Sequence, residues 1–228
     1  MTNAIPPDPT TNPPPEDPPL YLALVGQFPL AESAPRKFHL LLPETLGDRI
    51  DNRVAGSRNT AFIVLLQAGL DFLCDYNQVH REEPCVLAER EITSSGYDLP
   101  VSLADKIVPL LRQSPQNTTN VETCLNVSGR MAPFSRKPHA LLLPQRLADA
   151  IDAKTKGSRN SVFVVLLSVG MEIFRRRALK EKTVPIVRVG EFFKNQGYGR
   201  SDGNGRTVLS KTVPSDPGEP KDQSCPPG

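Results

Sequence analysis

The feature that most constrains the fold of this chain is an internal duplication. When the sequence is shifted by 101 positions, residues 36–97 align with residues 137–198 without a gap. Self-similarity at a fixed spacing indicates a repeated structural unit whose copies pack against one another. Two stretches carry the strongest identity: LLLP at Leu40–Pro43 and Leu141–Pro144, and GSRN at Gly56–Asn59 and Gly157–Asn160.

The composition changes outside the duplication. Residues 1–35 are rich in Pro and contain acidic residues but no Lys or Arg, and residues 199–228 are again rich in Pro and polar residues. Such segments bury too little apolar area to fold, so we predict that both are disordered. The predicted organisation is a tail (1–35), a first repeat (36–97), a linker (98–135), a second repeat (136–198) and a tail (199–228).

Each repeat is predicted to begin with a short strand followed by two helices. The apolar run before Pro43 is extended, because Pro disfavours helix in the residue before it. Glu44 lies in the first turn of a short helix, which Gly56 closes. Ser57 then caps a second helix, whose apolar residues follow helical spacing and form a wide stripe.

Equivalent glycines, Gly69 and Gly170, interrupt the apolar stripes of the two second helices. Glycine inside a helix costs about 1 kcal/mol relative to Ala, so its presence predicts the close approach of another backbone. A lone strand also leaves an unpaired edge, and each repeat therefore needs a partner of the same kind. We predict a mainly α fold in which the two strands pair as one short two-stranded antiparallel β-ribbon over the helices, as a tandem pseudo-dimer.

The strand ending in LLLP, the first helix, GSRN and the amphipathic second helix together resemble the ribbon-helix-helix family of DNA-binding proteins, of the Arc and methionine-repressor type. The resemblance covers residues 36–74 and 137–175. Two copies in one chain are similar in architecture to the TraY-type proteins of conjugative plasmids. The resemblance implies a ribbon in the major groove, with its outward side chains on base edges and with phosphates held at the starts of the second helices.

The start of a helix also favours anions on physical grounds, because its N–H groups are unsatisfied and carry partial positive charge. The GSRN segments add hydroxyl groups, an amide and a guanidinium there, which predicts a phosphate site in each repeat. An ordinary helix cap is the competing interpretation, and it needs only the serine. The residues predicted at these two sites are Ser57, Arg58, Asn59 and Thr60 in the first repeat and Ser158, Arg159, Asn160 and Ser161 in the second.

Strand side chains alternate between faces, so the two faces of the ribbon can be assigned by counting back from Pro43 and Pro144. The predicted core-facing residues are Phe38, Leu40 and Leu42 in the first strand and His139, Leu141 and Leu143 in the second. The predicted outward residues are Lys37, His39 and Leu41 in the first strand and Pro138, Ala140 and Leu142 in the second. Because Pro138 lacks a backbone donor, we predict that the second strand begins after it.

This outer face is less polar than the resemblance implies. Lys37 and His39 can hydrogen-bond bases, while Leu41, Ala140 and Leu142 can only contact thymine methyl groups. Three basic residues near the strand starts are predicted to bind phosphates: Arg36, Arg136 and Lys137. Residues 84–97 and 185–198 lie outside the resemblance but are retained in both copies, and we interpret them as structural extensions built from short strands or helix.

Several classes of function have no support in the sequence. The four cysteines and three histidines show no metal-ligand spacing, and no catalytic set recurs, so we predict no cofactor, no metal and no enzymatic activity. The N-terminus lacks the pattern of a signal peptide, and we expect a cytoplasmic protein. Residues 175–211 hold ten basic and three acidic residues, which favours a polyanionic partner.

We therefore predict a non-enzymatic protein that binds double-stranded DNA, as a transcriptional regulator. An accessory DNA-binding protein for plasmid transfer or partition is an alternative. A protein-interaction module of the antitoxin kind, with a degenerate DNA face, is a third possibility that the apolar outer face favours. Pairing of the two repeats within one chain, with or without further self-association, is common to all three.

Overall fold

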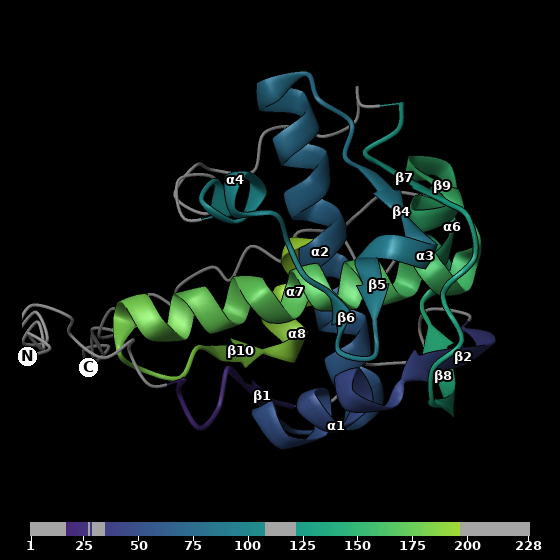
Figure 1. The fold of residues 1–228 in the computed structure, drawn as a ribbon. Helices are drawn as coiled ribbons and strands as arrows, with labels where there is room; N and C mark the ends of the chain where they lie inside the picture. Colours follow the sequence, from purple (N-terminus) through teal and green to yellow (C-terminus); the bar gives the residue numbers. More distant parts are fainter. Residues whose placement is uncertain (1–16, 27, 29–34, 108–121, 197–228) are drawn as a thin grey trace, which may run out of the picture.

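The computed structural model describes residues 17–26, 28, 35–107 and 122–196 (Figure 1). These residues form seven helices and ten strands in four sheets. The predicted fold class, mainly α with one two-stranded ribbon, is wrong: this is an α/β fold in which two of the sheets are three-stranded and parallel. Their strands are only two to four residues long and pair across large sequence distances. No local alternation of polar and apolar residues therefore indicates them in the sequence.

The elements of the first half, in chain order, are β1 (Leu22–Val25), β2 (Arg36–Pro43), α1 (Glu44–Arg53), β3 (Val54–Ala55), α2 (Arg58–His80), β4 (Cys85–Leu87), α3 (Ala88–Glu91), β5 (Ile92–Thr93) and β6 (Gly96–Tyr97). After α4 (Val101–Ala104), the second half contains β7 (Leu125–Ser128), β8 (Arg136–Leu143), α6 (Gln145–Lys154), β9 (Thr155–Gly157), α7 (Arg159–Glu181), β10 (Ile186–Arg188) and α8 (Val189–Asn195). The order of the main elements is the same in both halves.

The predicted pairing of the two repeats through their first strands is present. Strands β2 and β8 form an antiparallel two-stranded ribbon in which His39 lies opposite Ala140, its own equivalent under the 101-residue shift. A local pseudo-two-fold axis therefore passes through this pair. The predicted alternation also holds: the core-facing set is buried, and the outward set on both strands is exposed.

The two parallel sheets exchange strands between the repeats. Their strand orders are β10-β1-β3 and β4-β7-β9, so β10 of the second repeat joins a sheet of the first, and β4 does the reverse. The extensions at 84–97 and 185–198 thus supply the exchanged strands, although Gly197 and Tyr198 lie outside the described residues. The sheets lie on different sides of the crossed long helices (Figure 1).

The duplicated unit begins earlier than the sequence alignment indicated. The backbone N–H of Tyr21 donates to Arg53 O at 2.8 Å, and that of Cys124 donates to Lys154 O at 2.8 Å. Arg53 and Lys154 are equivalent, so β1 and β7 are equivalent too, at an offset of 103 positions instead of 101. A two-residue difference in the connection to the ribbon hid this match.

The predicted boundaries of tail and linker need correction for the same reason. Residues 17–26, which were assigned to a disordered tail, include β1, the central strand of its sheet, with Tyr21 and Leu22 buried. The predicted linker 98–135 includes β7, the central strand of the other sheet, with Leu125 and Val127 buried. The rest of the predicted tails, residues 1–16, 27, 29–34 and 199–228, apart from residues 28 and 35, lies outside the described residues.

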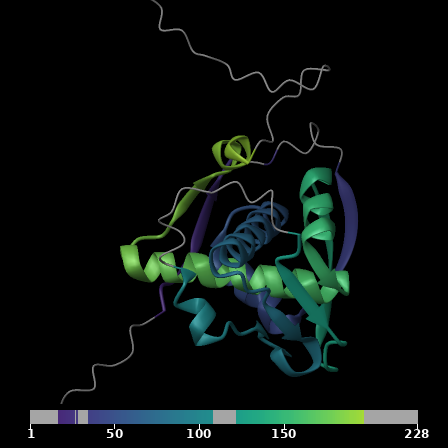
Figure 2. The same ribbon diagram turned by 90° about the horizontal axis from the view of Figure 1, so that it is seen from above.

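The long helices α2 and α7 cross at the centre of the molecule, and Figure 2 looks almost along α2 with α7 running across it. A Cβ on Gly69 would overlap the carbonyl oxygen of Leu166, and a Cβ on Gly170 would overlap that of Leu65. These two contacts are equivalent under the pseudo-two-fold axis. The prediction that another backbone approaches each glycine is confirmed: the backbone of α7 approaches Gly69, and the backbone of α2 approaches Gly170. Within the part of the chain that is described, neither of these helices nor any shorter one is long and apolar enough to cross a lipid bilayer.

The first glycine of each GSRN segment does not close the preceding helix as predicted. Helix α1 ends at Arg53 and α6 at Lys154, and a short strand follows each: β3 ends just before Gly56, and β9 includes Gly157. Gly157 has φ +124°, and a Cβ there would overlap the carbonyl oxygen of Val127 in β7. The glycine is therefore required where the chain passes close to the central strand of its sheet.

Candidate nucleic-acid interface

The outer face of the ribbon is the candidate interface that the sequence singles out. Its six side chains are exposed: Lys37, His39, Leu41, Pro138, Ala140 and Leu142. Leu41 and Leu142 are 44% and 37% exposed, which is unusual for leucines in a strand. The polar side chains, Lys37 and His39, come from one strand only, so the face has a polar strand and an apolar strand.

Each long edge of the ribbon is closed by an asparagine from the start of the other repeat's long helix. The side chain of Asn59 donates to Leu142 O at 3.1 Å and accepts from Leu142 N–H at 2.9 Å. Asn160 makes the same pair of bonds to Leu41, at 2.9 and 2.7 Å. We call these contacts the asparagine bridges. They satisfy the backbone N–H and C=O of one strand residue, as a neighbouring strand would, and they hold each helix start against the edge of the ribbon.

The asparagine bridges also explain why β8 tolerates a proline. Strand β8 begins at Arg136, so the prediction that it starts after Pro138 is wrong. Pro138 lies opposite Leu41, whose N–H and C=O both point away from β8 to Asn160. The pair is therefore a non-hydrogen-bonded one, and the missing N–H of Pro138 removes no bond from the ribbon.

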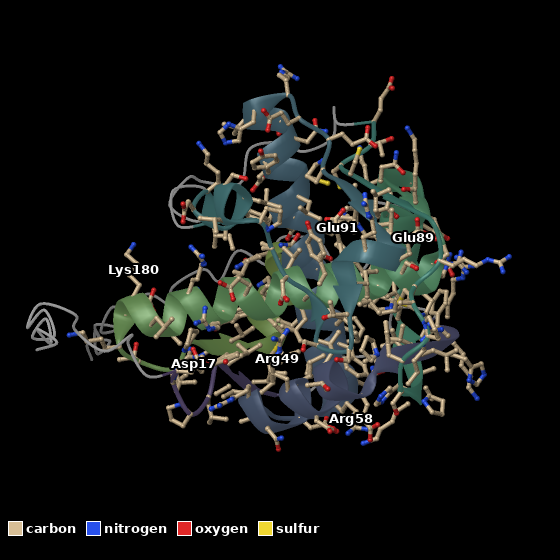
Figure 3. The ribbon with its side chains drawn as sticks, in the orientation of Figure 1. Asp17, Arg49, Arg58, Glu89, Glu91 and Lys180 are labelled. Atoms are coloured by element: carbon tan, nitrogen blue, oxygen red, sulfur yellow. The ribbon has the colours of Figure 1, made fainter. Side chains whose placement is uncertain are left out.

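The arginines of the two GSRN segments are held by the first helices. Arg58 forms an ion pair with Asp51 of α1, and Arg159 pairs with Asp152 of α6 at 2.8 Å. Figure 3 shows Arg58 beside α1, with its charged end at the surface. The two aspartates stand seven residues before their arginines in both repeats, and this repeated spacing is a signal in the sequence that indicates the pairs. Both arginines are exposed, so their outer faces remain open to solvent.

The basic residues at the ribbon ends are also engaged. Arg36 lies 3.4 Å from Asp149 and 3.6 Å from Asp152, and Lys137 lies 2.8 Å from Glu44 and 3.2 Å from Asp48. The hydrogen bond from Lys137 lowers the pKa of Glu44. Arg136 instead folds back on its own loop, donating to the carbonyl oxygens of Met131 and Ala132 and lying over the Phe134 ring. The acidic residues of α1 and α6 thus neutralise much of the charge around the ribbon.

The starts of α2 and α7 remain accessible. Ser57 and Ser158 occupy the N-cap positions and are exposed, whereas the fourth residues of the predicted sites, Thr60 and Ser161, are buried. Ser158 accepts a hydrogen bond from Ser161 N–H at 3.2 Å, which is an ordinary helix cap. The structure therefore brings the serine, arginine and asparagine of each GSRN segment together at the ribbon edge, while Thr60 and Ser161 belong to the core.

Beneath the ribbon, the pseudo-two-fold axis relates Phe38 to His139. Phe38 packs edge-on against Phe163, and His139 packs the same way against Phe62, each at 5.7 Å between ring centroids. Burial, and then the charges of Arg58 and Lys137, lower the pKa of His139, while Asp48 opposes the shift. The imidazole is therefore neutral at physiological pH and serves as an aromatic core residue.

The described residues contain no group of three or more His, Cys, Asp or Glu side chains placed to hold a metal ion. Cys74 and Cys124 are buried free thiols, and hydrogen bonding with Cys74, followed by burial, raises the pKa of Cys124. Comparison of the whole chain with known protein families, with curated proteins and with solved structures finds no match in any of the three.

Proposed function

We propose that this protein binds double-stranded DNA, with the outer face of the β2–β8 ribbon in the major groove and the starts of α2 and α7 on the flanking phosphates. The observation that carries the proposal is the pair of asparagine bridges, which hold one exposed helix start against each long edge of the ribbon. The major groove admits a two-stranded ribbon, and the backbones that border it lie on both sides. The resemblance of the repeat cores to ribbon-helix-helix proteins supports the same arrangement.

In this mode of binding the helix starts supply most of the affinity. Their unsatisfied N–H groups and the positive ends of two helix dipoles attract phosphate, aided by the exposed serine and arginine of each GSRN segment. Lys37 and His39 provide hydrogen bonds to bases, and Leu41, Ala140 and Leu142 provide contacts to thymine methyl groups. Because the polar residues lie on one strand, the preferred DNA site is asymmetric even though the fold is pseudo-symmetric.

Such a protein acts most simply as a cytoplasmic regulator of transcription, and accessory binding in plasmid transfer or partition uses the same surface. A protein-interaction module is the second candidate. It is favoured by the exposure of Leu41 and Leu142 and by the ion pairs that neutralise Arg36 and Lys137. In this case an apolar segment of a partner would cover the ribbon in place of DNA.

A pair of N-cap substitutions separates the two candidates. Ser, Asn and Asp cap helices about equally well, so both Ser57→Asp/Ser158→Asp and Ser57→Asn/Ser158→Asn should fold like the parent. The Asp pair, however, places a carboxylate where a phosphate would bind. We expect the Asp variant to bind a random duplex at least about tenfold more weakly than the Asn variant at low salt, because like charges repel there.

The measurement is fluorescence anisotropy with a labelled duplex at two salt concentrations, with circular dichroism as the check on folding. Binding by the parent should weaken steeply as salt is raised, because phosphate contacts release counterions. Equal binding by the Asp and Asn variants would rule out the helix starts as phosphate sites. A parent protein that binds no duplex at low salt would leave the protein-interaction module as the better proposal.

A further inference from the structure

A cavity of about 210 Å³ lies away from the ribbon, between the long helices and the exchanged C-terminal elements. Residues of α2, α7, β10 and α8 line it, so both repeats contribute to it. Its walls are mostly apolar and include a phenylalanine from each of three helices: Phe72, Phe174 and Phe192. A mostly apolar hollow with a few convergent polar groups is the usual form of a small-molecule site.

The charged residues that line this cavity are Asp71, Asp75 and Arg177. Asp71 accepts hydrogen bonds from two neutral amides, Gln67 at 2.8 Å and Gln196 at 3.0 Å. Arg177 forms an ion pair with Glu181 at 3.0 Å. Among the described residues, neither Asp71 nor Asp75 takes part in any ion pair within 4.0 Å, so the two carboxylates are unpaired although Arg177 lines the same cavity.

The other repeat shows how this fold balances a carboxylate at the same position. Glu172 is the equivalent of Asp71, and it pairs with Arg176 at 2.7 Å, four residues later on α7. Arg175 reaches the same carboxylate at 3.3 Å. In the first repeat, the position equivalent to Arg176 is occupied by Asp75, which adds a second negative charge where the second repeat has a positive one.

The surroundings of the two carboxyl groups raise their pKa values. Burial, together with the charge of Asp75, raises the pKa of Asp71 to about 6 against the opposing effect of the hydrogen bonds from Gln67 and Gln196. Burial also raises the pKa of Asp75. A partly buried carboxylate without a cationic partner costs free energy that an added cation can recover.

We propose that this cavity binds a small organic cation, an ammonium group on an apolar body. The ammonium would lie between Asp71 and Asp75, in the role that Arg176 has in the second repeat. The apolar body would lie against the three phenylalanines, whose ring faces also attract cations. The occupant would contact α2, α7 and α8 at once and would tie the two repeats together. This inference does not depend on the proposed DNA binding.

The test uses three probes of similar size: benzylammonium, the neutral benzyl alcohol and the anionic benzoate. Binding to the full chain is measured by isothermal titration calorimetry at pH 7.5. We expect saturable binding of benzylammonium, binding of benzyl alcohol that is weaker by about tenfold or more, and no binding of benzoate. Chemical shifts of the Ile173 and Val187 methyl groups, which line the cavity, report whether the probe lies there.

Two variants complete the experiment. Asp71→Asn removes the charge with little change of shape and should abolish the preference for benzylammonium over benzyl alcohol. Asp75→Arg copies the second repeat and should prevent binding by supplying the missing cation. Affinity for benzylammonium should also fall below about pH 6, because protonation of Asp71 removes its attraction.

Three results would overturn the proposal. One is the absence of saturable benzylammonium binding up to about 10 mM, and another is equal affinity for the amine and the alcohol. The third is binding that leaves the Ile173 and Val187 methyl signals unmoved, because the probe would then lie elsewhere. Circular dichroism of both variants shows whether a loss of binding comes from unfolding.

Discussion

The two repeats place different side chains on the ribbon surface but the same side chains at its supports. Two of the three equivalent outward pairs differ, Lys37 with Pro138 and His39 with Ala140, while Leu41 and Leu142 are the same residue. By contrast, Asn59 and Asn160 make the same bridges. The residues that hold the ribbon in place must be the same in both repeats, because each makes the same hydrogen bonds. The exposed side chains are not constrained in this way, so the two strands can differ in what they bind.

The same contrast recurs in the interior. Gly69 and Gly170 make matching contacts at the helix crossing. Two residues later on the two helices, however, Asp71 faces a cavity without an ion-pair partner, whereas Glu172 is neutralised by arginines. The residues are the same in both repeats where two backbones come into close contact, whereas the charges at the cavity differ between the repeats. Three predictions test this division, from the largest effect on stability to the smallest.

Substitution of either crossing glycine should have the largest effect. Gly69→Ala and Gly170→Ala each put a Cβ into a backbone carbonyl of the other helix, which cannot move without separating the pair. We expect each to lower the free energy of unfolding by about 3 kcal/mol, and equally in both repeats. Urea unfolding followed by circular dichroism measures the change.

Gly190→Ala is the matched control for the glycine prediction. Gly190 lies in α8, and a Cβ there would have no neighbour within 4 Å. Because Ala favours helix over Gly, this variant should be more stable than the parent by up to about 1 kcal/mol. A Gly69→Ala variant as stable as Gly190→Ala would show that the helices do not cross so closely.

Loss of an asparagine bridge should have an intermediate effect that crosses between the repeats. Asn59→Ala removes both bonds to Leu142, and Asn160→Ala removes both bonds to Leu41. Each should cost about 2 kcal/mol, because two strand groups lose their partners. Hydrogen exchange then locates the effect: the Leu142 amide should exchange faster in the first variant and the Leu41 amide in the second. If hydrogen exchange became faster only in the strand of the substituted repeat, the assignment of each asparagine to the strand of the other repeat would be wrong.

The smallest effect should have opposite signs in the two repeats. Asp71 has a folded-state pKa raised to about 6, so its ionisation reduces stability as the pH rises through the interval between its unfolded value and 6. Asp71→Asn should therefore stabilise the protein by about 1 kcal/mol at pH 7.5, and this gain should vanish below about pH 4. Glu172→Gln should instead destabilise it by roughly 1 kcal/mol at pH 7.5, because two arginines each lose one ion pair.

Thermal unfolding of the Asp71→Asn and Glu172→Gln variants at pH 4 and pH 7.5 measures both changes. If the two variants shift the melting temperature in the same direction at pH 7.5, the contrast between the two carboxylates is wrong.

Much of the central framework could be predicted from the sequence, because it rests on local periodicity and on identity between the copies. The alternation in LLLP assigned both faces of the ribbon, including the inward direction of His139. The mid-helix glycines predicted a close backbone contact, and the strand that lacked a partner predicted the pairing of β2 with β8. These inferences depend on the alternation of side chains along a strand and on the size of each side chain, both of which can be deduced from the local sequence.

What only the tertiary structure decided is which residue meets which across the fold. Strands of two to four residues have no readable period, so the parallel sheets and the exchange of β4 and β10 were invisible in the sequence. The partners of Arg58, Asn59 and Asp71 were equally hidden, because an ion pair or a hydrogen bond forms between groups that folding brings together from distant positions. The repeated GSRN marked important residues, but only the fold shows what each one contacts. Each glycine lies against the central strand of a sheet, each arginine pairs with an aspartate of the preceding helix, and each asparagine bonds to the strand of the other repeat.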